Sequence, residues 1–230
     1  MPRLLVSVRS VEEALVAFAG GASIIDLKEP ARGPLGRADT EVWQASREML
    51  PAEACLSVAL GELPEWTDQA DPSPSHFAGI SYRKLGLAGV GADWRTGWAN
   101  LRDRWGEGPA WVAVVYSDWP LAQAPEPTAV LDEALAVAGC TGILIDTWDK
   151  SSPSTVGRSW IPWLARARQG GLTVALAGGL NESRIERLAP LDPDWIAVRG
   201  AACHDGDRGS AIDPARVARL ARLVKRMELE

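Results

Sequence analysis

Residues 23–30 read SIIDLKEP, and this short stretch contains the pattern that decides the fold. A run of apolar residues ends in an aspartate and a lysine and then meets a proline. Apolar runs of the same kind recur along the chain, at residues 3–8, 23–28, 54–60, 80–85, 111–116, 142–146, 172–177 and 194–199. Runs this short and this rich in Val, Ile and Leu are typical of strands buried on both faces of a parallel sheet.

Longer helical patterns separate these runs, at residues 10–19, 40–50, 92–105, 127–138, 153–169, 182–188 and 214–227. Ser10 followed by Glu13 is a capping box, and Asn181 is a second N-cap candidate. Residues 63–78 must supply the remaining crossover, and the stretch 64–75 is irregular enough for a loop or lid. Eight strand-then-helix units predict an α/β fold of the (β/α)8 TIM barrel type, one domain over residues 1–230. An open, doubly wound sheet is the alternative.

Composition excludes several classes of function. The net charge is −6 with acids and bases mixed along the chain, so no basic patch for nucleic acid is expected. No apolar run has membrane-spanning length, and the N-terminus does not resemble a signal peptide. The three cysteines are far apart, which favours reduced thiols in the cytoplasm and no metal site. Since nucleotide and flavin motifs are absent too, we expect no cofactor. The oligomeric state stays open, a homo-oligomer included.

Lysine is rare in this chain, and its positions are informative. Of four lysines, Lys28, Lys84 and Lys150 lie at or just beyond predicted strand ends, whereas twenty arginines are spread over the rest. The C-terminal ends of the strands carry the active site of a (β/α)8 barrel. A neutral lysine amine can attack a carbonyl to form a Schiff base, which arginine cannot do. One such lysine would be read as a surface or salt-bridging residue, but three together favour chemistry.

Two aspartates accompany these lysines. Asp26 precedes Lys28 by two residues, so both side chains can face the same side of the strand, and Asp146 precedes Lys150 by four. Neighbouring ammonium groups disfavour one another, which should lower the pKa of at least one amine. The aspartates can hold lysines charged or move protons themselves. A simple salt bridge or loop cap is the alternative role for each of them.

The last two strand ends predict a phosphate site. Gly178 and Gly179 follow the seventh run, and Arg199 ends the eighth, with Gly200 directly after it. Barrels often bind phosphate there through backbone N–H groups, and glycine permits close approach of the backbone. Arg208 follows nearby and is either a further ligand or a solvated side chain. Taken alone, the glycine pair is also compatible with a plain tight turn.

Four segments together resemble one family of proteins. They are IIDLKEPARGPLG at 24–36, YRKLGLAG at 82–89, IDTWDK at 145–150 and VRGAAC at 198–203. In this order and spacing they resemble the (5-formylfuran-3-yl)methyl phosphate synthase family, from the first strand to the last. The combination of motifs is specific, whereas each motif alone is not.

The resemblance implies a lyase of methanofuran biosynthesis that needs no cofactor. It condenses two molecules of glyceraldehyde 3-phosphate into a furan aldehyde phosphate, with loss of phosphate and water. Carried over by position, Lys28 forms the Schiff base and Lys84 accepts a proton. Asp26, Asp146 and Lys150 complete the implied catalytic set. Two other functions stay open: a class I aldolase-like barrel enzyme acting on sugar phosphates, and a barrel that binds a phosphorylated metabolite without turnover.

Overall fold

Eight parallel strands close into a barrel in the computed structural model, which describes residues 2–151 and 155–227. The strands are β1 (Arg3–Val8), β2 (Ile24–Leu27), β3 (Leu56–Glu62), β4 (Tyr82–Gly86), β5 (Ala110–Tyr116), β6 (Cys140–Asp146), β7 (Thr173–Leu176) and β8 (Trp195–Val198). Each pairs with the next, and β8 pairs with β1, for example Ile196 with Leu4. This pairing confirms the (β/α)8 barrel and rules out the open doubly wound sheet.

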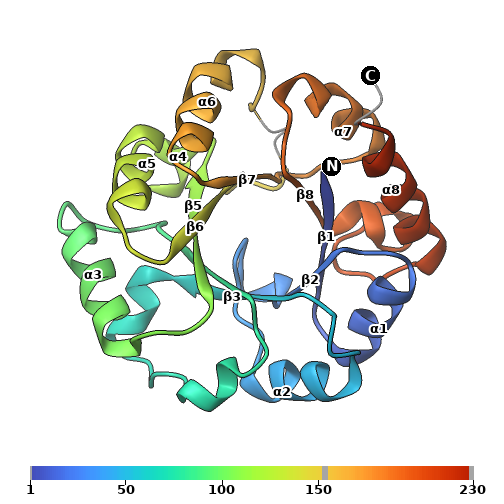
Figure 1. Cartoon of the computed structure of the whole chain (residues 1–230), viewed down its shortest axis with the longest axis horizontal. Helices are drawn as coiled ribbons and strands as arrows, with labels where there is room; N and C mark the ends of the chain where they lie inside the picture. The colour runs from blue at the N-terminus through green and yellow to red at the C-terminus, as the bar shows by residue number, and fades with distance from the viewer. Residues whose placement is uncertain (1, 152–154, 228–230) are drawn as a thin grey trace.

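The helices form a ring outside the strands (Figure 1). They are α1 (Val11–Ala19), α2 (Thr40–Met49), α3 (Trp94–Trp105), α4 (Trp119–Ala122), α5 (Pro127–Ala136), α6 (Ile161–Gln169), α7 (Glu182–Leu188) and α8 (Pro214–Arg226). Both N-cap residues accept as predicted: the Ser10 hydroxyl from the Glu13 N–H, and Asn181 from the Arg184 N–H. The reciprocal half of the capping box differs, because the Glu13 carboxylate accepts from the N–H of Arg9, one residue before the cap. None of the helices in the described ranges is long and apolar enough to cross a membrane.

Two connections differ from the prediction. The crossover after β3 contains no α-helix; it is made by two 3-10 helices, η2 (Leu63–Thr67) and η3 (Pro74–Phe77). Proline at the start of each one removes a backbone donor and favours such short turns. The helix predicted at 153–169 begins only at Ile161, with a proline in its first turn. Residues 153 and 154 lie outside the described residues.

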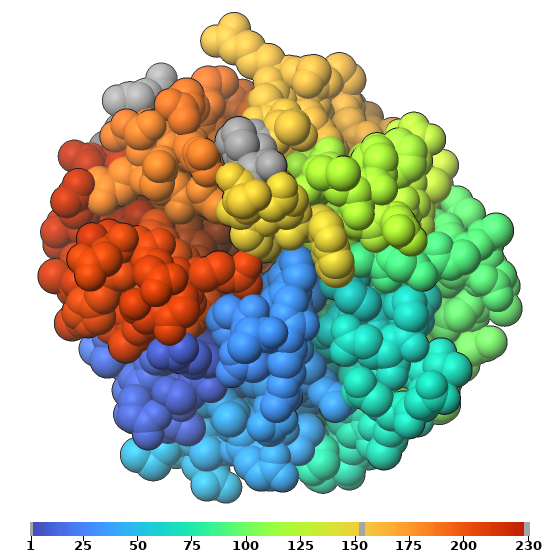
Figure 2. Space-filling model, turned by 180° about the vertical axis from the view of Figure 1, so that it is seen from behind, coloured from blue at the N-terminus to red at the C-terminus, as the bar shows by residue number. Residues whose placement is uncertain are grey.

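A layer of buried apolar side chains lies inside the barrel, beneath the C-terminal ends of the strands. Inside the barrel pack the side chains of Leu5, Ile24, Ala59, Val112, Val114, Leu144, Ala175 and Trp195. The rings of Tyr82 and Trp195, both at strand starts, meet edge-on with centroids 4.8 Å apart and fill the opposite end. The charged side chains that line the cavity lie above this apolar layer, toward the C-terminal ends of the strands. Figure 2 looks onto a face where the loops after β2 (blue), β6 (yellow) and β8 (orange-red) converge.

Candidate active site

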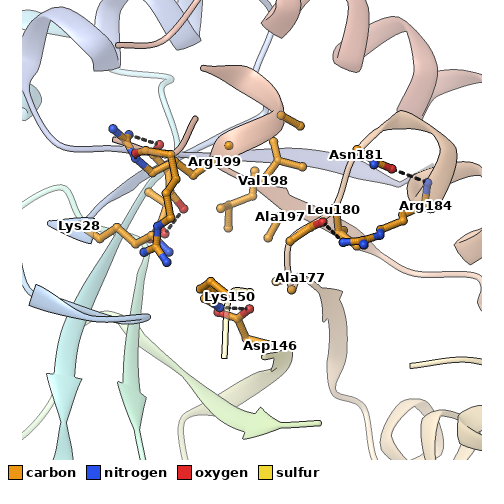
Figure 3. A pocket seen from close by; sticks show the side chains of 18 of the residues that line it. Lys28, Asp146, Lys150, Ala177, Leu180, Asn181, Arg184, Ala197, Val198 and Arg199 are labelled. Atoms are coloured by element: carbon orange, nitrogen blue, oxygen red, sulfur yellow. Dashed lines mark hydrogen bonds and ion pairs between the residues drawn. The ribbon is translucent and has the colours of Figure 1, made fainter. Parts of the chain in front are cut away.

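A cavity of about 530 Å³ lies at the C-terminal ends of the strands. All nine residues predicted from the sequence line it: Asp26, Lys28, Lys84, Asp146, Lys150, Gly178, Gly179, Arg199 and Gly200. Figure 3 shows Lys28, Arg199 and the Asp146–Lys150 pair around this space, with Asn181 and Arg184 on the side away from Lys28. The barrel thus brings together residues that are up to 174 positions apart in the sequence, from Asp26 to Gly200.

Asp26 and Lys84 form an ion pair in the barrel interior. Both side chains are only 2% exposed, and Lys84 Nζ donates to Asp26 Oδ1. Ser7 on β1 completes the arrangement, since its hydroxyl donates to Asp26 Oδ2 at 2.9 Å. A charge this deeply buried needs an opposite charge and hydrogen bonds to offset its lost hydration. The three residues therefore hold one another in a fixed geometry across β1, β2 and β4.

Lys28 follows β2 directly and is 8% exposed. Its Nζ donates to the carbonyl oxygen of Pro34 at 3.0 Å. Burial lowers the pKa of Lys28 to about 8, the carboxylates of Asp146 and Asp26 act in the opposite direction, and the neighbouring lysines add a smaller lowering effect. The predicted lowering is confirmed in direction, but its main cause is burial, because the barrel wall and the loop of Pro34 exclude water. A substantial part of this amine is neutral near physiological pH.

A second acid–base pair faces the same cavity from β6. Lys150 Nζ lies 2.5 Å from Asp146 Oδ1 and also donates to the Thr147 carbonyl. Burial alone would raise the pKa of Asp146, but the ammonium groups of Lys150 and Lys28, with hydrogen bonds from Lys150 and Thr147, keep it below its usual value. Lys150 is thus paired with Asp146, which agrees with the salt bridge that the sequence leaves open for this aspartate.

The loop that carries Lys150 is anchored by a residue that the sequence analysis missed. Asp118, just beyond β5, accepts from the backbone N–H of Trp148 at 2.7 Å and from that of Asp149 at 2.9 Å. Its carboxylate thereby fixes the turn between Asp146 and Lys150. The pattern YSD at 116–118 was the available signal, since an acid just after a strand is a frequent cap for a neighbouring loop.

The β7–β8 side of the cavity is lined by arginines. Gly178 and Gly179 have φ values of 100° and 60°, a region that favours glycine. Arg184 in the first turn of α7 donates to the Gly179 carbonyl at 2.6 Å. Arg184, Arg208 and Arg216 all line the cavity, and Arg184 and Arg216 were not predicted. Guanidinium groups beside a glycine turn are suited to bind an anion such as phosphate.

Arg199 lines the cavity, but its guanidinium is already occupied. It donates to Glu13 Oε2 at 2.8 Å and to the carbonyl oxygens of Ser7, Arg208 and Ser210. The Arg199 and Glu13 side chains are 4% and 7% exposed. Phosphate binding by Arg199 therefore stays a prediction, and it concerns the backbone of Arg199 and its loop rather than the guanidinium. Its side chain ties β8 to α1.

Comparisons with known proteins identify the family of this chain. The family model described as 4-HFC-P synthase matches residues 4–221. This chain belongs to the 4-HFC-P synthase family. Relatives from Archaeoglobus fulgidus and Methanocaldococcus jannaschii are each 33% identical over 234 residues, which is 96% of this chain and 99% of theirs. Both are named (5-formylfuran-3-yl)methyl phosphate synthase, so the family resemblance found in the sequence is confirmed.

Solved structures that resemble this 4-HFC-P synthase family member share its barrel. 3-Hexulose-6-phosphate synthase from Salmonella typhimurium has a TM-score of 0.64 at 18% identity, covering 98% of this chain and 99% of its own. Phosphoribosylanthranilate isomerase from Thermotoga maritima has a TM-score of 0.63 at 15% identity, with the same coverage. At such low identity these similarities show the fold alone.

Proposed function

We propose that this enzyme condenses two molecules of glyceraldehyde 3-phosphate into (5-formylfuran-3-yl)methyl phosphate, as a lyase that releases phosphate and water. The observation that carries the proposal is Lys28, a buried amine with a pKa of about 8 that lines the same cavity as two lysine–carboxylate pairs. The names of the relatives agree with this product. Its place would be the biosynthesis of a methanofuran-type cofactor in the cytoplasm.

The first step is attack of the neutral Lys28 amine on a substrate carbonyl. The carbonyl oxygen leaves as water, and the resulting iminium draws electrons from the adjacent carbon, which becomes acidic. The Pro34 carbonyl accepts from Lys28 Nζ. It can accept from the N–H of the iminium in the same way, which favours the protonated form that withdraws electrons.

Protons then have to move to and from carbon and oxygen. Lys84 is the proposed acceptor of the proton from the acidified carbon, and it becomes able to accept once its own ammonium proton has passed to the Asp26 carboxylate, to which Nζ already donates. The Asp146–Lys150 pair lines the same cavity and is suited to serve the oxygens that leave as water or phosphate. General acid–base groups within hydrogen-bonding reach of the reacting atoms are what enolisation and dehydration require.

Substrate phosphate is proposed to bind on the β7–β8 side. Arg184, Arg208 and Arg216 supply positive charge there, and the turn at Gly178 and Gly179 lets the backbone approach closely. A phosphate held on this side leaves the carbonyl end of a triose free to extend toward Lys28. This arrangement is consistent with a short, singly phosphorylated substrate.

The test is incubation of the purified protein with glyceraldehyde 3-phosphate alone. We expect release of inorganic phosphate, a furan absorbance and a product whose mass corresponds to the furan aldehyde phosphate. Lys28→Arg serves as the control and should give none of these signals. A condensation product that keeps both phosphates would point to an aldolase-like activity. Binding without an imine or turnover would point to a binding protein, and either result would contradict the proposal.

A further inference from the structure

A carboxylate outside the residues considered so far lies at the rim of the barrel. Glu62 ends β3, is partly buried, and accepts two hydrogen bonds. Tyr116 Oη donates to its Oε1 at 2.5 Å, and the Ala88 N–H donates to its Oε2 at 2.7 Å. Both of its oxygens therefore face donors, which suits the ionised carboxylate because this form only accepts hydrogen bonds.

The fold leaves room for this carboxylate at one position. Gly86 is opposite Glu62 in the β3–β4 register, and a Cβ atom at Gly86 would overlap with the Glu62 carboxylate. The backbone at Gly86 is not in the positive-φ region that favours glycine. The space that the Glu62 carboxylate needs therefore explains why a glycine stands at this position. The last residues of β4 and β5, Gly86 and Tyr116, thus hold Glu62 in one orientation.

Tyr116 connects Glu62 to the cavity. It is the register partner of Asp146 on β6, so both side chains project from the same face of the sheet. Its ring meets that of Trp148 edge-on at 5.5 Å, in the turn that carries Lys150. Tyr116 also belongs to the same buried cluster as Leu35, and Leu35 lines the cavity. A shift of the Tyr116 hydroxyl would therefore disturb the wall next to Asp146.

We propose that Glu62 is a positioning residue of the proposed reaction: it holds the Tyr116 hydroxyl and thereby fixes the side of the site that carries Asp146 and Lys150. The inference rests on the proposed function, because it concerns the rate of that reaction. Glu62 does not line the cavity and so acts through Tyr116.

The surrounding charges give this role a pH dependence. Burial raises the pKa of Glu62 to about 7, the hydrogen bonds from Tyr116 and Ala88 oppose this rise, and the charges of Glu65 and Asp146 add to it. Burial, followed by the charge of Glu62, raises the pKa of Tyr116 well above its ordinary value, with smaller contributions from Asp146 and Asp118. Tyr116 therefore stays a donor. Protonation of Glu62 removes one acceptor, so kcat should fall as the pH drops through about 7.

The decisive experiment compares Glu62→Gln with the wild type in the glyceraldehyde 3-phosphate assay across the pH range. The amide has a single acceptor oxygen and cannot serve both donors. We expect kcat to fall about tenfold with little change in KM, and the extra fall of kcat that protonation of Glu62 causes near pH 7 to disappear, so that only the fall due to protonation of Lys28 remains. Borohydride-trapped adduct at Lys28 should form as in the wild type. Glu53→Gln, an exposed residue just before β3, is the matched control and should keep the wild-type profile.

Two further variants keep the test decisive if Glu62→Gln does not fold. Tyr116→Phe removes the hydroxyl through which Glu62 acts, so kcat should fall and its dependence on protonation of Glu62 near pH 7 should disappear. Gly86→Ala displaces the carboxylate without removing it and should reproduce the loss of kcat. A merely structural role would lower activity without moving the pH profile, and unchanged profiles in the folded variants would overturn the inference. A wild type without furan product would instead contradict the proposed function.

Discussion

Lys28 and Pro34 are joined by a hydrogen bond of 3.0 Å from the lysine Nζ to the proline carbonyl oxygen. The proposed nucleophile is therefore oriented by the loop that follows its own strand. Such a bond holds the amine in place while it is charged and while it is neutral, since Nζ carries hydrogen in both forms. The pH at which the amine becomes reactive then depends on its pKa alone.

The rate of Schiff-base formation should follow the titration of Lys28. The pKa of Lys28 is about 8, so below this pH most of the amine is protonated and cannot attack. The rate of trapping by borohydride should therefore rise with pH up to about 8 and then level off. Peptide mapping of the reduced adduct should locate the label on Lys28. Lys84→Arg should still form some adduct while losing turnover, because the nucleophile is intact. A label on Lys84 or Lys150 would contradict the assignment.

The same titration should be visible in protein stability. The folded-state pKa of Lys28, about 8, lies below its ordinary value of 10.5, so between these values the unfolded chain binds the extra proton. The free energy of unfolding of the wild type should therefore rise with pH across this window, by about 3 kcal/mol at most, relative to Lys28→Met. Urea unfolding of both proteins between pH 7 and pH 11 measures the difference. If the free energies of unfolding of the two proteins change with pH in parallel, burial does not lower the pKa of Lys28.

Removing the charge of Asp26 should destabilise the fold. Asp26→Asn leaves the Lys84 ammonium buried without its counter-charge, which costs about 3–5 kcal/mol. Ser7→Ala removes only one hydrogen bond to the same carboxylate and should cost about 2 kcal/mol. The double variant Asp26→Asn with Lys84→Gln should recover part of the loss, because no charge is then stranded. Equal losses in the single and double variants would argue against a coupled pair.

Two arginines that line the cavity should behave differently when each is replaced by alanine. Arg184→Ala should raise KM for the triose phosphate on the order of tenfold with little change in stability, because its guanidinium is at the cavity. Arg199→Ala should lower the free energy of unfolding by about 3 kcal/mol, because it removes the buried partner of Glu13, whose carboxylate then keeps only the more exposed Arg9. Steady-state kinetics and urea unfolding of both variants separate the two roles. A raised KM in Arg199→Ala together with a loss of stability in Arg184→Ala would show that Arg199, not Arg184, binds the phosphate.

The part of the site that lies at strand ends was predictable from the sequence. Apolar runs fix where strands stop, and a parallel barrel brings those ends to one face. The two-residue spacing of Asp26 and Lys28, and the positions of Lys84 and Asp146, then place four charged side chains at one cavity. The presence of lysine at these positions, in a chain whose basic residues are mostly arginine, indicated the chemistry.

What escaped prediction depends on pairings between distant residues. Glu62 and Tyr116 are 54 positions apart, and their contact depends on strand register and on the small residue at Gly86. The partner of Arg199 is 186 positions away. Its place at the end of a strand is clear from the sequence, but whether its guanidinium binds a ligand or Glu13 is decided by how α1 packs beside β8.

The Arg199–Glu13 pair also has a consequence for the way the protein is made. It joins the end of β8 to α1, next to the seam where β8 pairs with β1, so it can form only after nearly the whole chain has left the ribosome. A chain that still lacks β8 has an open barrel, so the burial that lowers the pKa of Lys28 should be incomplete in it. Closure of the seam should then complete the reactive amine. A nascent or truncated chain should therefore capture surrounding aldehydes less readily than the closed barrel.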